Sequence, residues 1–286
     1  MYQLVQSLKS INNFFVRHIF AKNQCNMKIF IPSDLTDNSV EVLEKWLPFM
    51  DKPDTEIYLI NIIEPSSGAV MIDIAKILRS EAILKFDGLT AKLKLSNARM
   101  NILVEEGYFE RKMAELVMTY RPDMVLLPSK AKEGIDKYLI GQKAQKFIGK
   151  IKCPILIVPS AFDAIEFKNI GLAVDREDMP TEENMQQLGL IEYYFKSKLL
   201  PFHIQTNMDE DLQVYSDFSE GNDNQNVKVC KAVSVSHGIT HFVDHEKIDL
   251  LAMVTHKRNI FERFVIESNS RRMVSANNLA VLIFNN

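Results

Sequence analysis

Short apolar runs alternate along the whole chain with segments in which apolar residues recur at helical spacing. In the first half these runs are nearly continuous rather than alternating, which is typical of parallel strands covered on both faces. Five runs predict strands: Lys28–Pro32, Glu56–Ile63, Met100–Val104, Met124–Pro128 and Pro154–Val158. The helical segments supply the crossovers that parallel strands need. The pattern predicts a doubly wound α/β domain that binds ligands at the carboxyl ends of its strands.

The second half of the chain repeats this pattern. Asp123–Leu127 precedes Asp249–Met253 by 126 residues, and the same offset relates Ile155–Val158 to Val281–Phe284. The opening strands of the two copies are 141 residues apart, so the second copy has lost 15 residues. We place this loss in the polar stretch Asp209–Asn226. The sequence therefore predicts a duplication with two tandem doubly wound parallel-sheet domains, at residues 27–160 and 167–286.

Residues 1–26 differ in composition from the rest of the chain. They contain Lys9, Arg17 and Lys22 but no acidic residue, and their apolar residues recur at helical spacing, which predicts an amphipathic basic helix. Three interpretations remain open: a membrane-surface or targeting segment, a helix that docks on the domain behind it, or a segment upstream of a true start at Met27. The polar residues within it favour the second and third.

Composition and charge narrow the function classes. Hydrophobic residues make up 47% and charged residues 25%, as in an ordinary globular protein. The net charge of −3 argues against a nucleic-acid partner, and no apolar run is long enough to predict a membrane span. Cys25, Cys153 and Cys230 are too far apart for a CxxC metal site. They predict a reducing, cytoplasmic environment, with Cys153 and Cys230 as buried thiols.

Glycine is scarce in this chain. It contains 10 glycines, whereas average usage of about 7% would give roughly 20. Glycine allows backbone N–H groups to approach a ligand closely, so the shortage argues against glycine-rich phosphate loops.

Polar residues follow the first and fourth strands of the first copy. The first strand ends in Pro32-Ser33-Asp34, and the fourth leads into Ser129-Lys130-Ala131 and, nine residues later, Gly141-Gln142 at the start of a helix. This arrangement, with a last strand that begins Cys-Pro-Ile-Leu-Ile-Val, resembles the universal stress protein family. The resemblance implies a tandem member with an adenine nucleotide alpha hydrolase-like fold, whose two domains pack as a pseudo-dimer.

The resemblance also implies a ligand site. In nucleotide-binding members the aspartate after the first strand holds the adenosine, while a glycine turn and a helix start cradle the phosphates. Carried over to the first domain, a site for ATP or AMP comprises Pro32, Asp34, Ser129, Lys130, Gly141 and Gln142. A vestigial site in the second domain comprises Asp175, Thr255, His256 and Ser268.

Departures from the family pattern weaken both sites. Five of the six glycine positions carry other residues: Pro128, Ala131, Val254, Lys257 and Glu267. Proline has no N–H to donate, and a glutamate would repel a phosphate. We therefore expect at most a weakened nucleotide site in the first domain and none in the second.

These features together predict a non-enzymatic cytoplasmic stress-response protein, and no catalytic residue is assigned. The alternative is an enzyme on the same fold that binds ATP or AMP and hydrolyses or senses it. The missing phosphate turn favours the first prediction. Since family dimers form through the last strand, the resemblance implies pairing between Ile155–Val158 and Val281–Phe284, with a homodimer as a further arrangement.

Three histidines recur every four residues in the second domain. His237, His241 and His245 share one helix face, and two of them could ligate zinc. The favoured interpretation is a solvated stripe without metal, because Ile239 and Phe242 place the buried face of the helix elsewhere.

Overall fold

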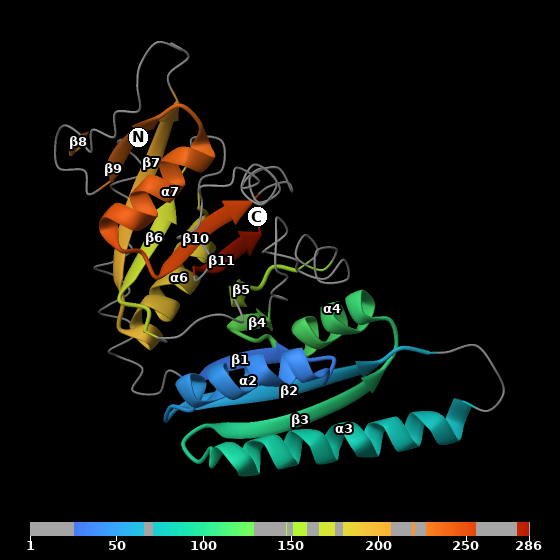
Figure 1. Ribbon diagram of the computed structural model, residues 1–286. Coiled ribbons are helices and arrows are strands. Elements are labelled where there is room, and N and C mark those ends of the chain that lie inside the picture. Colours follow the sequence, from blue (N-terminus) through green and yellow to red (C-terminus); the bar gives the residue numbers. More distant parts are fainter. Residues whose placement is uncertain are drawn as a thin grey trace. The chain divides into compact units, whose positions relative to one another are not determined.

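The computed structural model describes residues 26–65, 71–128, 147, 151–158, 166–174, 180–206, 219–220, 227–255 and 279–285. They form two compact units, one with the described residues up to Val158 and one with those from Glu166 onward (Figure 1). Of the segment at residues 1–26, only Asn26 lies within the described residues. In the described part of the chain, no helix is both long and apolar enough to cross a bilayer.

The first unit is a parallel sheet with the strand order β3-β2-β1-β4-β5. Its strands are β1 (Met27–Pro32), β2 (Thr55–Ile63), β3 (Arg99–Glu106), β4 (Met124–Pro128) and β5 (Ile155–Val158). Its described helices are α2 (Asp37–Met50), α3 (Met71–Leu93) and α4 (Phe109–Tyr120). All five predicted strands are confirmed. The central strand β1 is buried on both faces, as its continuous apolar run predicts.

The second unit has the strand order β11-β10-β6-β7-β9-β8. Its strands are β6 (Asn169–Ala173), β7 (Lys198–Thr206), β8 (Ser219–Glu220), β9 (Lys228–Ala232), β10 (Leu250–Thr255) and β11 (Ala280–Asn285). Its described helices are α6 (Glu182–Phe195) and α7 (Val235–Glu246). Strand β8 lies in the polar stretch Asp209–Asn226 and runs antiparallel to β9. This stretch has no apolar pattern that would have predicted a strand.

The two units repeat in the register that the sequence predicts. Helices α4 and α7 begin and end 126 residues apart, and each ends at a residue in the left-handed conformation. These residues are Arg121 (φ 47°) and Lys247 (φ 51°), and each donates its backbone N–H four residues back, to Val117 O and Val243 O respectively. The correspondence therefore extends to the helix caps, where non-glycine residues adopt the same uncommon conformation.

Helices α2 and α6 follow the first strand of each unit, so the start of each helix lies near the carboxyl end of that strand. Thr36 is the N-cap of α2, and Thr181 is the N-cap of α6, where its side chain and that of Asn184 form a reciprocal capping box. The Thr36 side chain makes no capping hydrogen bond, so the two helices are capped differently.

Candidate functional site

The loop after β1 lies at the carboxyl edge of the first sheet and is held by a buried serine. Ser33 is 8% exposed, and its backbone N–H donates to Ile60 O at 2.8 Å. Its Oγ accepts the Leu35 N–H at 3.0 Å and forms a hydrogen bond with Ser39 Oγ, also at 3.0 Å. Ser39 in turn donates to Thr36 O at 3.0 Å. These bonds tie the loop to the first turn of α2.

Asp34 lies on the exposed side of this loop. Its Oδ1 accepts hydrogen bonds from Thr36 Oγ1 at 2.7 Å and from Thr36 N at 3.2 Å, which forms an Asx turn. Leu35 has φ of 55°, a left-handed conformation that turns the chain sharply into α2. The structure therefore holds the Asp34 carboxylate in a defined position at the edge where doubly wound folds bind ligands.

Asn61 on β2 supports the same loop and was missed by sequence reasoning. Its Nδ2 donates to Ser33 O at 3.0 Å, so it fixes the peptide that precedes Asp34. A signal was present, because Asn61 is the single amide side chain within the apolar run of β2. A polar side chain in a parallel strand covered on both faces needs a specific partner.

The second unit builds the same frame with different side chains. Val174 takes the place of Ser33, and its backbone N–H donates to Phe202 O at 2.9 Å. His203 takes the place of Asn61, and its Nδ1 donates to Val174 O at 3.0 Å. The buried Val174 side chain has no hydroxyl, so it cannot form the bonds that Ser33 makes to its loop and helix.

The structure describes only part of the predicted nucleotide site. Pro32 ends β1, next to the Asp34 loop, and Pro128 ends β4, where it pairs with Val158 of β5. The other predicted residues of the first site, Ser129, Lys130, Gly141 and Gln142, lie outside the described residues. In the second unit Thr255 ends β10, whereas Asp175, His256 and Ser268 lie outside the described residues.

The predicted histidine stripe lies on α7. His237 and His241 are half-buried and His245 is exposed, while Ile239 and Phe242 are buried on another side of the helix. The rings of His241 and His245 stack with centroids 6.1 Å apart. Burial, and then the neighbouring His245 and His237, lower the pKa of His241. Burial, together with the neighbouring imidazoles, therefore disfavours a charge on the His241 ring.

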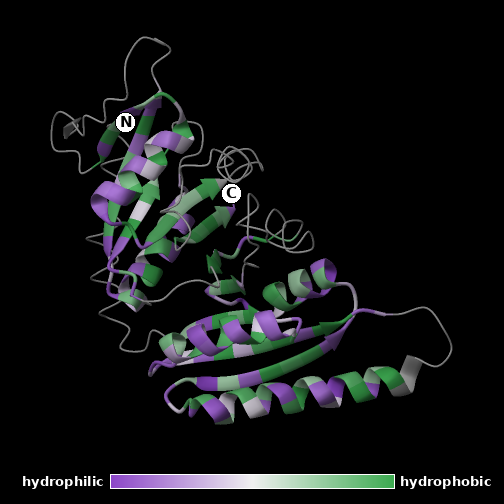
Figure 2. Ribbon diagram, in the orientation of Figure 1, coloured by the Kyte–Doolittle hydropathy of each residue, from purple (hydrophilic) through white to green (hydrophobic). Residues whose placement is uncertain are grey.

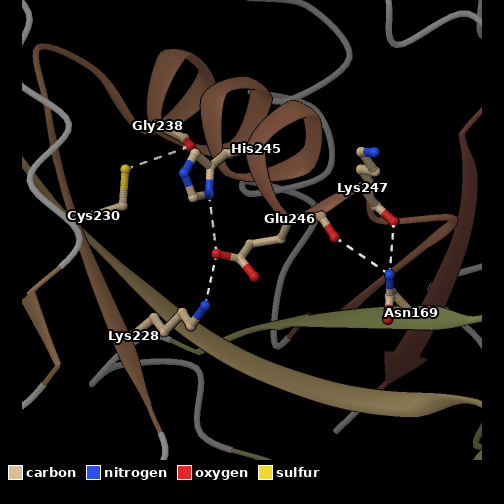
Figure 3. Close-up of polar contacts among 7 residues, drawn as sticks. All are labelled: Asn169, Lys228, Cys230, Gly238, His245, Glu246 and Lys247. Atoms are coloured by element: carbon tan, nitrogen blue, oxygen red, sulfur yellow. Dashed lines mark hydrogen bonds and ion pairs between the residues drawn. The ribbon is translucent and has the colours of Figure 1, made fainter.

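A carboxylate orients the exposed end of the stripe. His245 Nδ1 bonds Glu246 Oε1 at 3.0 Å, and Lys228 Nζ bonds the same oxygen at 2.6 Å (Figure 3). No group of three or more His, Cys, Asp or Glu side chains within the described part of the chain could hold a metal ion. The zinc interpretation therefore lacks a third protein ligand among these residues.

Two of the three cysteines lie in the described residues, and both are buried as predicted. Cys153 donates to Pro122 O at 3.3 Å, and Cys230 contacts Gly238 O at 3.7 Å. Burial raises the pKa of both thiols, and the Asp123 carboxylate raises that of Cys153 further. Both side chains therefore remain protonated, unreactive thiols at neutral pH.

Comparison with known proteins identifies relatives that match about half of the chain. Residues 26–159 match the model of the universal stress protein family. A universal stress protein of Methanocaldococcus jannaschii is 21% identical over 154 residues, which cover 51% of this chain and 90% of that protein.

Solved structures extend the similarity in fold to most of the chain. A universal stress protein from Archaeoglobus fulgidus is 14% identical and superposes with a TM-score of 0.60, covering 90% of this chain and 96% of that one. This similarity confirms the predicted tandem α/β fold. A universal stress protein solved in complex with cAMP is 14% identical and covers 47% of this chain and 98% of its own, with a TM-score of 0.36.

Proposed function

We propose that the chain, whose residues 26–159 match the model of the universal stress protein family, is a non-enzymatic stress-response protein with one weakened adenine-nucleotide site. The observation that carries the proposal is the loop after β1. Its exposed Asp34 carboxylate is positioned by Thr36, and the peptide before it is fixed by Ser33 and Asn61. A positioned carboxylate accepts hydrogen bonds from the hydroxyl or amino groups of adenosine.

The phosphate side of the site supports weak rather than tight binding. Pro128 ends β4 without an N–H to donate, where the family pattern has the first glycine of the phosphate turn. An adenosine moiety held by Asp34 would therefore gain few phosphate contacts, and ATP should bind little better than AMP.

The described residues of this edge also support a role without catalysis. Ser33 Oγ, a potential nucleophile, bonds Ser39 Oγ and the Leu35 N–H rather than a base. A serine without a neighbouring general base is a weak nucleophile. A cytoplasmic location is part of the proposal, and the two buried free cysteines are consistent with a reducing compartment.

Nucleotide content and titration calorimetry test the proposal. The purified protein should carry no nucleotide, and ATP and AMP should bind with a Kd weaker than about 10 μM. Asp34→Ala should abolish this binding. Asp87→Ala, which removes an equal charge from an exposed position on α3, should leave it unchanged.

Three outcomes would contradict this function. Co-purified ATP, or low-micromolar affinity lost in Asp34→Ala, would show that the site has not weakened. Absence of any binding would remove the nucleotide from the proposal altogether. Phosphate release from ATP that disappears in Asp34→Ala would favour the hydrolysing enzyme instead.

Pairing of the two last strands is the structural part of the proposal. Strand β5 is the last strand of the first sheet beside β4, and β11 is the last strand of the second beside β10. Both are wholly apolar through Ile155–Val158 and Val281–Phe284, and pairing would remove two such edges from solvent.

Hydrogen exchange tests this pairing. An unpaired edge strand leaves alternate backbone N–H groups facing solvent, so these should exchange quickly. Uniform slow exchange along both segments is the expected result. Alternating fast and slow exchange in either segment would exclude it.

A further inference from the structure

Helix α3 is much longer than its neighbour α2 in the same unit. The helices contain 23 and 14 residues, and Lys92 near the end of α3 bonds Glu44 of α2 at 2.6 Å. Both helices follow parallel strands and so run in the same direction. With a rise of 1.5 Å per residue, the N-terminal part of α3 extends on the order of 20 Å beyond the start of α2. Figure 1 shows this projection.

The projecting part of α3 exposes large apolar side chains. Ile74 is 45% exposed, Ile77 56%, Leu78 41% and Leu84 70%. Their spacing places them on one side of the helix, whereas Phe86 and Leu89 are buried. Figure 2 shows apolar and polar residues interspersed along α3.

The size of this patch indicates an interaction surface. We call it the α3 face, and it consists of Ile74, Ile77, Leu78, Glu81, Leu84, Lys85 and Gly88. Its four large apolar side chains expose on the order of 400 Å² together, which is about half of the ~800 Å² that each partner contributes to a standard interface. The face can therefore supply the apolar centre of such an interface.

Gly88 points to close approach by another helix. It lies in the interior of α3 and is exposed, and a Cβ placed there would meet nothing within 4 Å. Nothing among these neighbours therefore excludes a side chain, although glycine weakens a helix. A glycine on the exposed side of a helix allows a second backbone to approach closely.

We propose that the α3 face binds a second copy of this chain, with the two α3 helices packed antiparallel about a twofold axis at Glu81. In this arrangement Ile74 lies opposite Gly88 of the second copy, so a large apolar side chain meets the smallest residue. Leu78 lies opposite Leu84 of the second copy. A twofold axis makes each contact occur twice, which doubles the apolar area from a single short face.

Charge complementarity favours this occupant. Glu81 and Lys85 are both exposed on the α3 face, four residues apart. About an axis at Glu81, each Lys85 lies one helical turn from the Glu81 of the other copy, so two reciprocal ion pairs offset the approach of the two carboxylates. A face with apolar residues alone would not select this register.

Sedimentation velocity over a range of concentrations tests the proposal on the full chain. The wild type should dimerise reversibly, and Ile77→Glu combined with Leu84→Glu should weaken dimerisation by about tenfold or more. Met118→Glu is the matched control, because Met118 is 73% exposed on α4, outside the α3 face. It should leave the dimer unchanged.

Two further variants separate the interface from general effects on folding. Gly88→Leu should raise the thermal stability of the monomer, because leucine favours helix, and weaken the dimer, because it blocks the approach of Ile74. In a Cys25→Ser background, Glu81→Cys should form a disulfide-linked dimer on oxidation. Arg79→Cys, on another side of α3, should not.

Each contrary result overturns the proposal. A wild type that stays monomeric at every concentration excludes a self-interface and makes the basic amphipathic segment 1–26 the next occupant to examine. A dimer that survives both glutamate substitutions uses a different surface. A Gly88→Leu dimer as strong as the wild type removes the predicted close approach.

Discussion

The two units hold the amino ends of their central strands in the same way. In the first, Asp123 Oδ2 accepts the Lys28 N–H at 2.7 Å. In the second, Asp249 Oδ2 accepts the N–H groups of Lys168 and Asn169, each at 2.9 Å. The side chains of two corresponding residues, Lys28 and Asn169, also cap a helix in each unit. Lys28 Nζ donates to Tyr120 O at the end of α4. The Asn169 amide donates to the carbonyls of Glu246, the last residue of α7, and of Lys247, which follows it (Figure 3).

The carboxyl ends differ where the amino ends agree. Ser33 links its loop to α2 through its hydroxyl, whereas Val174 at the same place is a buried apolar residue. The contrast separates the residues that maintain the fold from those that shape a site. The fold requires the amino-end contacts in both halves. A ligand loop requires the carboxyl-end network, and among the described residues only the first half has the serine that builds it.

The largest effect that we predict comes from a position where the two units pack differently. Gly238 on α7 corresponds to Lys112 on α4, and a Cβ at Gly238 would lie 2.7 Å from Ile204 Cγ2 and 3.1 Å from Ala232 Cβ. Gly238→Leu should therefore lower the free energy of unfolding by about 3 kcal/mol through overpacking. Urea denaturation followed by circular dichroism measures the loss.

Lys112→Leu is the matched substitution in the first unit. Lys112 is partly exposed and pairs with Glu115 at 3.0 Å, so its loss should change stability by no more than about 0.5 kcal/mol. Equal losses at the two positions would mean that α4 and α7 approach their sheets equally closely.

Removing the shared aspartates should have the next largest effect. Asp249→Ala leaves two backbone N–H groups without their carboxylate, and Asp123→Ala leaves one. We expect losses of about 2 and about 1 kcal/mol respectively, measured by urea denaturation. If Asp123→Ala lowers the free energy of unfolding by more than Asp249→Ala does, the number of N–H groups that the carboxylate accepts does not determine its contribution to stability.

The sequence predicts the parallel strands well because the pattern that identifies each strand lies within the strand itself. A strand covered on both faces needs a continuous apolar run, and such runs mark all five strands of the first unit. The 126-residue offset extends this to the second unit. Strand β8 could not be predicted, because its two residues, Ser219 and Glu220, are polar and owe their pairing to β9 rather than to their own pattern.

The site is harder to predict because its support is long-range. Asp34 and Pro32 follow from their place at the end of a strand. The roles of Asn61 and Ser39 depend on which atoms meet after folding, since Asn61 lies 28 residues from the Ser33 carbonyl that it bonds. The residues expected around a phosphate depend on Ser129–Gln142, outside the described residues, and stay a prediction.

Asp51 provides a pH-dependent comparison. It follows α2 and accepts N–H bonds from Ser96, Asn97 and Ala98, whereas the residue after α6 is Lys196. Burial acts to raise the pKa of Asp51, but these backbone bonds lower it by more, so its folded pKa lies below the ordinary 3.8. Its stabilisation is therefore fully present above pH 3.8 and is lost as pH falls through the folded pKa.

Asp51→Ala should therefore lower stability by about 1.5 kcal/mol at pH 7, since solvent screens this partly exposed group. The gap between wild type and variant should narrow as pH falls below 3.8, as measured by urea denaturation at several pH values. Asp87→Ala controls for loss of an exposed charge. A gap that stays constant down to pH 3 would show that packing, rather than the carboxylate charge, accounts for the role of Asp51.

The smallest effect tests the carboxyl edge itself. Asn61→Leu removes the donor to the Ser33 carbonyl and should cost about 1 kcal/mol. Asn61→His should cost almost nothing, because His203 makes the corresponding bond to Val174 O in the second unit. If the frame is interchangeable, nucleotide binding should follow the same order, with Asn61→His retaining the affinity that Asn61→Leu loses. An Asn61→His variant that is as stable as the wild type but does not bind nucleotide would show that the Asn61 amide contacts the nucleotide directly. Stability and binding would then depend on different atoms of the same side chain.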